Sequence, residues 1–292
     1  HCLNLNICIK MINKIHKYNF LIVGGGLIGS LAGLHLKKKG YKVLVVDKNI
    51  KFSNDRRTLA VNANSKDFLK SLDIWNNLKN KPQKINKIII KDSINKAPLI
   101  FENKKEEMGN VIFNNELLLK ATNQLKASGS IIEVSDLDIS QLYENKIIKI
   151  KNKKYFFNHI ILSIGKKFNE NNLIKKYSLP SSHQAYVGFF KHSIDHHQTA
   201  YEIFTERGPL AVLPSPDTRK NSSTFIYSTK DKLSDTAIFN LLRKNFNSTH
   251  GDIELIKTVN QFSISPHLSK DLSKKYFLIG DTLRSIHPVA GQ

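Results

Sequence analysis

The chain has 292 residues, of which 40% are hydrophobic and 24% charged, so it is large and apolar enough for two domains and is not intrinsically disordered. Its formal net charge of +21 suggests nucleic acid or an anionic membrane surface as a partner. Nucleic acid is disfavoured because the positive charge is nearly all lysine, is spread along the chain and forms no stripe with aromatic residues.

The first ten residues, 1–10, precede Met11 and are predicted to be a non-native upstream segment. They contain both cysteines, Cys2 and Cys8. The sequence therefore predicts no disulfide framework and no cysteine metal site. It also shows no secretory signal peptide, because no apolar core follows a charged start.

The stretch 19–47 has the order strand, glycine turn, helix, strand. Residues 20–23 form a short apolar run typical of a strand that is buried on both faces of a parallel sheet. Gly24, Gly26 and Gly29 follow in G-x-G-x-x-G spacing and open a helix predicted over 27–39. A second buried strand is predicted over 41–46, and Asp47 follows it.

Each residue of this motif has a physical task in dinucleotide binding. Gly24 permits the tight turn, Gly26 lets a pyrophosphate approach the backbone, and Gly29 lets the helix and strand pack closely. Asp47 stands at the right spacing to accept hydrogen bonds from an adenosine ribose. Two alternatives are a buried helix that tolerates glycines and a membrane span, and the glycine content disfavours the span.

The next segments continue an α/β pattern. Apolar residues at helical spacing run from Phe68 to Trp75, and a lysine-rich turn is predicted over 145–154. The remaining elements are strands over 85–91, 98–101, 131–134 and 156–165, and an amphipathic helix over 114–127.

From His183 the pattern changes to short strands separated by turn residues, which predicts an antiparallel sheet and hence a second domain. The fold class predicted is α/β, with a Rossmann-like dinucleotide-binding domain on a parallel sheet and an inserted antiparallel-sheet substrate domain. The nucleotide domain takes 11–84, 102–180 and 265–292, and the substrate domain 85–101 and 181–264. The new strands are predicted over 184–191, 200–205, 210–214 and 224–228, with a helix over 237–246 and a returning strand over 276–279.

A metal site is suggested by three histidines that lie close together in the sequence, His192, His196 and His197. We predict none, because they flank a turn between strands and no carboxylate pattern completes a ligand set. Ser163 precedes Ile164-Gly165 and does not form a nucleophile elbow. The sequence therefore identifies no catalytic side chain.

Several motifs occur in a fixed order along the chain. Besides the glycine motif, they are Asp55 to Val61 (DRRTLAV) with Leu72 to Trp75 (LDIW), Met108-Gly109, Glu202-Ile203-Phe204 with 208–214 (GPLAVLP), and 278–281 (LIGD) with 287–292 (HPVAGQ). Together they resemble the FAD-dependent aromatic hydroxylases of the ubiquinone-biosynthesis type, which have a para-hydroxybenzoate hydroxylase-like fold. The last motif stops at Gln292, so we expect the chain to be truncated at the C-terminus.

The resemblance implies roles for individual residues. Gly24, Gly26, Gly29 and Asp47 would hold the ADP half of FAD, and Arg57 would lie near its phosphates and flavin. Gly280 and Asp281 would meet the ribityl chain, and Pro288 and Gly291 would line the isoalloxazine. The implied reaction uses NAD(P)H as reductant and a flavin C4a-hydroperoxide to hydroxylate the ring of a polyprenylated phenol with dioxygen.

Such a substrate lies in a membrane, so the resemblance implies a cytoplasmic enzyme that is peripheral on the inner face of the cytoplasmic membrane, within a biosynthetic complex. Ile164 stands where the family usually has an aspartate, which keeps other functions open. The alternatives are another FAD oxidoreductase of this fold, acting on a different aromatic or an isoprenoid double bond, a non-catalytic member of the complex, and a plain NAD dehydrogenase.

Overall fold

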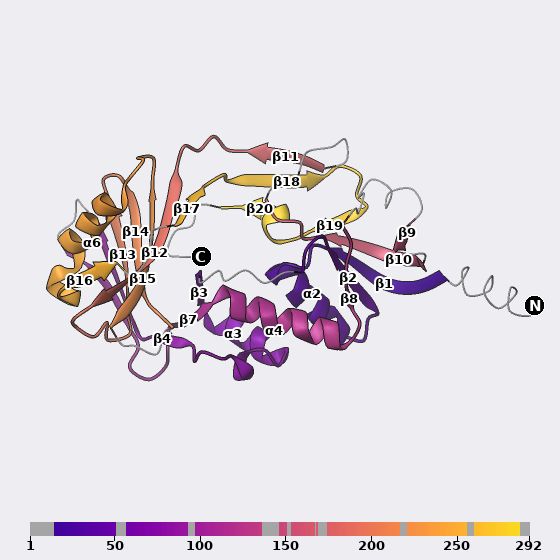
Figure 1. Cartoon of the computed structure of the whole chain (residues 1–292), viewed down its shortest axis with the longest axis horizontal. Coiled ribbons are helices and arrows are strands. Elements are labelled where there is room, and N and C mark those ends of the chain that lie inside the picture. The colour runs from indigo at the N-terminus through magenta and orange to yellow at the C-terminus, as the bar shows by residue number, and fades with distance from the viewer. Residues whose placement is uncertain are drawn as a thin grey trace, which may run out of the picture. The chain divides into compact units, whose positions relative to one another are not determined.

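The computed structural model describes residues 15–50, 57–92, 97–135, 146–150, 153–166, 168, 174–216, 221–255 and 260–286 (Figure 1). Contacts divide the chain into two units. Unit 1 draws on His1–Ser53, Leu118–Ser178 and His267–Ser285, and unit 2 on Asn54–Leu117, Leu179–Pro266 and Ile286–Gln292. This grouping places 54–84 and 102–117 with the antiparallel sheet, whereas the sequence assigned them to the nucleotide domain; the functional boundaries stay a prediction.

Unit 1 is built on a parallel sheet in the order β19-β10-β1-β2-β8, with every neighbouring pair parallel. This confirms the predicted Rossmann-like fold. Helix α2 (Leu27–Lys38) connects β1 to β2, and α4 (Asn114–Ala127) precedes β8. The strands are β1 (Ile15–Val23), β2 (Val43–Asp47), β8 (Ile131–Glu133), β10 (Lys153–Leu162) and β19 (Tyr276–Leu278).

The order of the strands creates a switch point. The chain runs from β1 outward through β2 to β8, and then returns to the other side of β1 for β10 and β19. The loops after β1 and β10 therefore diverge at the carboxyl edge of the sheet. Ligands of open α/β sheets bind at such a point.

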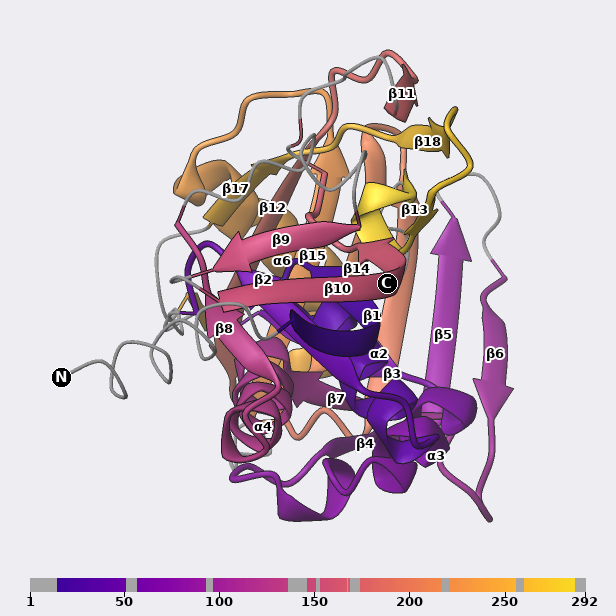
Figure 2. The same ribbon diagram turned by 90° about the vertical axis from the view of Figure 1, so that its right-hand side faces the viewer.

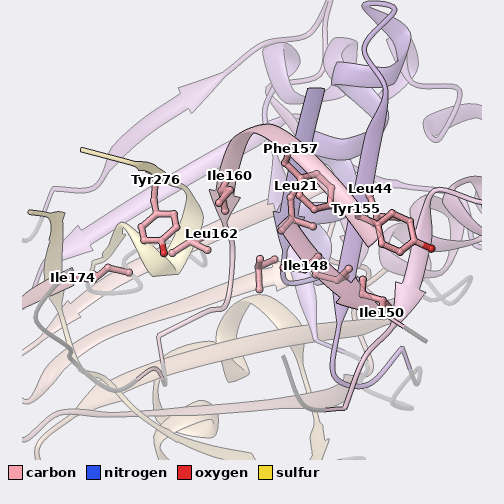
Figure 3. Close-up of a cluster of buried hydrophobic side chains, with 12 residues drawn as sticks. Leu21, Leu44, Ile148, Ile150, Tyr155, Phe157, Ile160, Leu162, Ile174 and Tyr276 are labelled. Carbon is pink, nitrogen blue, oxygen red and sulfur yellow. The ribbon is translucent and has the colours of Figure 1, made fainter. Parts of the chain in front are cut away.

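Buried side chains from five strands and β11 form the core on one face of this sheet (Figure 3). Strand β9 (Ile147–Ile150) pairs antiparallel with β10 and buries Ile148 and Ile150 in that core. The prediction of a turn over 145–154 was therefore wrong for these four residues. Alternate isoleucines in a lysine-rich run are the signal for a half-buried strand, which the charge obscured.

A second, three-stranded sheet in unit 1 has the order β11-β18-β20. Its strands are β11 (Ile174–Ser178), β18 (His267–Asp271) and β20 (Arg284–Ser285). The ring of His267 binds the carbonyl oxygen of Asp281 at 2.9 Å, which ties this sheet to the segment that follows β19. The short one-turn helix η3 (Gly280–Thr282) lies in that segment.

Unit 2 is built on an eight-stranded sheet in the order β16-β12-β15-β14-β13-β5-β6, with β17 also paired to β12. Helix α6 (Asp235–His250) covers one face (Figure 1), where Ile238, Leu242 and Phe246 pack on the strands. The sheet is antiparallel as predicted, except that β5 and β13 are parallel. The strands are β5 (Lys87–Asp92), β6 (Leu99–Glu102), β12 (Gln184–His192), β13 (Thr199–Thr205), β14 (Gly208–Pro214), β15 (Ser222–Thr229), β16 (Ile253–Leu255) and β17 (Asn260–Ser263).

A small antiparallel sheet, β3-β7-β4, completes unit 2 together with α3 (Ala63–Ser71) and η1 (Trp75–Asn77). Its strands are β3 (Thr58–Val61), β4 (Gln83–Ile85) and β7 (Gly109–Phe113). The single strand predicted over 85–91 is thus divided between two sheets. Asn86 lies at the break, where its backbone N–H and its side-chain amide both bind Gln198.

Candidate functional site

The glycine turn after β1 is closely packed against the end of β10. Gly24 has a φ of +104°, and a Cβ atom there would lie 2.1 Å from the carbonyl oxygen of Ser163. A Cβ on Gly29 would lie 1.9 Å from the carbonyl oxygen of Gly24. Both positions therefore require glycine, as the motif predicts for a tight turn.

The close approach between helix and strand, which the sequence assigned to Gly29, is shared by a second glycine. A Cβ on Gly33 would lie 2.8 Å from Cγ2 of Val45 in β2. Gly29 lets α2 start directly beside the turn. Both glycines keep the first turns of α2 close to the sheet.

Gly26 differs from its neighbours because nothing lies within 4 Å of the place where its Cβ would be. It is the N-cap of α2 and has no side-chain cap among the described residues, and the first turn contains no acidic residue. The N–H groups at the start of a helix carry partial positive charge. This open, uncapped helix start fits a pyrophosphate.

Asp47 closes the other side of the turn. Its Oδ2 accepts a hydrogen bond from the N–H of Gly25 at 2.5 Å, and its Oδ1 accepts one from the N–H of Asn49 at 2.9 Å. The carboxylate is partly exposed, and each oxygen can accept a second bond. It therefore holds the shape of the turn and can also receive ribose hydroxyls.

The segment after β19 joins the same edge of the sheet. A Cβ on Gly280, which has a φ of +59°, would lie 3.2 Å from the side chain of Ile28 in the first turn of α2. The hydroxyl of Thr282 donates to the carbonyl oxygen of Gly165 at 3.4 Å. The structure thus brings Gly24, Gly26, Gly29, Asp47 and Gly280 together within unit 1, with an exposed Asp281 beside them.

Ile164 follows β10 at this edge, and its side chain packs against the core of unit 1. A carboxylate at this position would lose hydration against apolar side chains. The isoleucine therefore has a structural explanation.

Arg57 belongs to unit 2. Its guanidinium lies 5.4 Å from the centre of the Phe262 ring, and its carbonyl oxygen accepts the N–H of Asn114 at the start of α4. The neighbouring Asn115 buries its Oδ1 with no hydrogen-bond partner among the described residues. Pro288 and Gly291 lie outside the described residues, as does Arg56.

The histidines predicted not to bind metal have other contacts. His192 binds the carbonyl oxygen of Ile194 at 2.6 Å and the hydroxyl of Ser223 at 3.0 Å, and His196 accepts the N–H of Gln198. Among described residues, no group of three or more His, Cys, Asp or Glu side chains could hold a metal ion. The absence of a metal stays a prediction.

Sequence reasoning missed His250, which ends α6 and packs 4.7 Å from His192, ring centre to ring centre. Burial, together with the nearby His192 and His196, lowers the pKa of His250 to about 3. Burial also lowers the pKa of His192. The sequence feature that could have revealed His250 is its place at the end of the row of buried residues along the helix.

Comparisons with known proteins include the segment that carries the glycine turn. Residues 17–133 match the family model described as an FAD binding domain. A search by sequence finds no significant match among curated proteins.

Solved structures show the same fold at low sequence identity. The p-nitrophenol 4-monooxygenase PnpA from Pseudomonas putida DLL-E4 is 12% identical, with a TM-score of 0.71 over 95% of this chain and 76% of that one. The flavin-dependent brominase Bmp2 is 13% identical, with a TM-score of 0.67 over 93% and 73%. A geranylgeranyl bacteriochlorophyll reductase-like protein from Thermoplasma acidophilum is 17% identical, with a TM-score of 0.62 over 96% and 74%. Residues 17–133 therefore resemble an FAD binding domain, and the chain has the same fold as these solved structures.

Proposed function

We propose that this protein is an FAD-dependent monooxygenase that hydroxylates the ring of a phenol, with NAD(P)H as reductant. The observation that carries the proposal is the carboxyl edge of the parallel sheet, where the open start of α2 and the Gly280 segment meet. When bound, FAD accepts hydride and activates dioxygen. The protein's part is to hold the cofactor and to keep water from the reacting groups.

Each residue of this edge receives a binding role in the proposal. The backbone around Gly26 receives the pyrophosphate, and Asp47 accepts hydrogen bonds from the ribose of the ADP half. Gly24 and Gly29 hold the shape of that cradle. Gly280 and Asp281 meet the ribityl chain. For Arg57, Pro288 and Gly291, the support for a role near the flavin is the resemblance of the sequence motifs alone.

The substrate proposed is a polyprenylated phenol of ubiquinone biosynthesis. The support is the resemblance of residues 202–204 and 208–214, which form the hairpin of β13 and β14. Within this hairpin the buried Glu202 pairs with Ala211 across the strands.

Such a substrate requires contact with a membrane. None of the described helices has the length and hydropathy to cross a bilayer. We therefore propose peripheral contact with the inner face of the cytoplasmic membrane, as part of a biosynthetic complex. The net charge of +21 supports attraction to anionic lipid.

A second candidate is reduction of an isoprenoid double bond. The likeness in fold to a geranylgeranyl bacteriochlorophyll reductase-like protein favours it. This reaction needs FAD and a reductant but no dioxygen, so the oxygen requirement separates the two candidates.

The experiment is to supply the FAD-loaded protein with NADH or NADPH and a prenylated 4-hydroxybenzoate or prenylated phenol, in buffer containing labelled dioxygen. We expect oxygen uptake with the substrate and a product carrying one labelled oxygen atom. A saturated product formed without oxygen would support the reductase instead. If neither NADH nor NADPH reduces bound FAD, the result would support the non-catalytic alternative.

A further inference from the structure

Strand β6 (Leu99–Glu102) is the outermost strand of the eight-stranded sheet, beyond β5 (Figure 2). All four of its residues are exposed. The exposed fractions are 63% for Leu99, 54% for Ile100 and 49% for Phe101. Because side chains alternate along a strand, these three apolar groups project from both faces of the sheet edge.

This combination is unusual for a sheet edge facing water. Native edge strands are protected by lysines, prolines, bulges or a covering element, because they otherwise pair with other chains. Single exposed apolar side chains are common on protein surfaces, whereas three in succession are unfavourable in water unless they serve a function. Pro98 precedes β6, but no lysine interrupts its apolar run. We therefore expect this edge to contact an apolar or amphipathic partner.

Charged residues around β6 indicate the chemistry of that partner. Lys87 lies 3.9 Å from Glu102, nitrogen to oxygen, and offsets its charge. Lys91 is the residue before the last one of β5, and Lys104 and Lys105 follow β6 closely. These four lysines outnumber the carboxylates of Asp92, Glu102 and Glu106 beside the apolar run, because the next carboxylate, Glu107, pairs with Lys66 and Lys84 instead.

We propose that β6 and these flanking lysines dock the protein on the interface of an anionic phospholipid bilayer. The inference rests on the membrane contact of the proposed function and names the surface that makes it. Apolar side chains would enter the boundary between headgroups and acyl chains, and the lysines would meet anionic headgroups. At that depth the edge N–H and C=O groups of β6 still reach water and headgroup oxygens.

A second copy of the chain fits this edge less well. Two copies carry the same net charge of +21 and repel each other, whereas an anionic surface attracts each of them. A strand of four residues also contributes little of the roughly 800 Å² per partner that a stable protein interface buries. Charge complementarity and size therefore favour the bilayer.

The test measures sedimentation of the FAD-loaded protein with vesicles of phosphatidylglycerol and phosphatidylcholine, without phenol substrate. The variant Leu99→Ser/Phe101→Ser should partition at least about tenfold more weakly than the wild type, or ~1.4 kcal/mol. The matched control is Tyr177→Ser/Leu268→Ser, a cross-strand pair on β11 and β18 with exposed fractions of 49% and 55%. It should bind vesicles as the wild type does.

A second measurement does not depend on destabilising changes. In Phe101→Trp, we expect tryptophan emission to shift to shorter wavelength on vesicles containing phosphatidylglycerol and much less on phosphatidylcholine alone. An unchanged spectrum, or equal vesicle binding by the β6 variant and the wild type, overturns the proposal. Loss of self-association in the β6 variant with unchanged vesicle binding would assign the edge to a second copy. Because the vesicle assay contains no phenol substrate, its result does not depend on whether the protein hydroxylates a phenol. A failure of the docking proposal and a failure of the proposed function can therefore be distinguished.

Discussion

The carboxyl edge of the parallel sheet and the helix-covered sheet of unit 2 are constructed in different ways. The first is made mainly by the backbone, because Gly24, Gly26, Gly29 and Gly280 leave room for close approach. The second is made by side chains, with aromatic rings and three histidines packed under α6. A site made of backbone shows itself as glycine spacing, whereas a cluster of side chains becomes visible only after folding.

The histidine cluster illustrates the second kind of construction. His192, His196 and His250 come from two separate segments and meet beside Phe190, Tyr201 and Phe246. Burial lowers the pKa of His192, and it lowers the pKa of His250 to about 3. Substitutions in these regions should differ in their effect on the free energy of unfolding or of FAD binding, and the largest effect is expected at the glycine turn.

The largest effect is expected from Gly24→Ala. The new Cβ would lie 2.1 Å from the carbonyl oxygen of Ser163 at a φ of +104°, so the free energy of unfolding should fall by at least about 3 kcal/mol. Gly40→Ala is the control, because Gly40 has a φ of +88° with nothing within 4 Å of its Cβ position. Denaturant unfolding should show a loss of only about 1 kcal/mol there. Equal losses would mean that the turn is not tightly packed.

The next effect concerns pH and the histidines. The unfolded chain protonates His250 near its ordinary pKa of 6.5, whereas the folded protein does so only near 3. Between these values the unfolded state binds more protons, so stability decreases as the pH falls. At pH 5 the loss from His250 is about 2 kcal/mol.

His250→Gln should reduce this pH dependence in unfolding experiments at pH 5 and pH 7. His197→Gln, at an exposed position, is the control and should leave the slope unchanged. An unaltered slope in the His250 variant would show that other groups govern acid sensitivity.

A third, smaller effect separates binding from stability. Gly26→Ala has open space at the Cβ position and a φ of −62°, so the free energy of unfolding without FAD should change little. The methyl group would occupy the approach of the pyrophosphate and weaken FAD binding about tenfold, or ~1.4 kcal/mol. Flavin fluorescence titration measures the affinity. Unchanged affinity would remove Gly26 from the cofactor cradle.

The smallest effect is expected at an ion pair of unit 2. Lys66 binds Glu107, and its hydrogen bond lowers the pKa of that carboxyl. The pair therefore stabilises the protein above the ordinary pKa of 4.5, and this contribution is lost as the pH falls. Glu107→Gln should cost up to about 1 kcal/mol at pH 7, whereas Asp67→Asn, beside the exposed Lys70, should cost nearly nothing.

Much of unit 1 could be predicted from the sequence because local rules and tertiary structure agree there. The helix predicted over 27–39 forms as Leu27–Lys38, and the helix over 114–127 forms as predicted. The strand β9 was missed, because the lysines around its isoleucines concealed the alternation. Ile164 was taken as a departure from a cofactor motif, but its contact with the core gives it a packing role.

The sequence by itself determined the strand–glycine–helix–strand unit, the spacing of its glycines and the presence of a second, mainly antiparallel sheet. These depend on periodicity and on short spacings within one stretch of chain. Only the tertiary structure decided that Gly24 packs on Ser163, that Gly280 meets Ile28, and that His192 meets His250. It also placed the apolar β6 at an open edge. Those contacts join residues far apart in the chain, and their energies depend on burial, which no local pattern specifies.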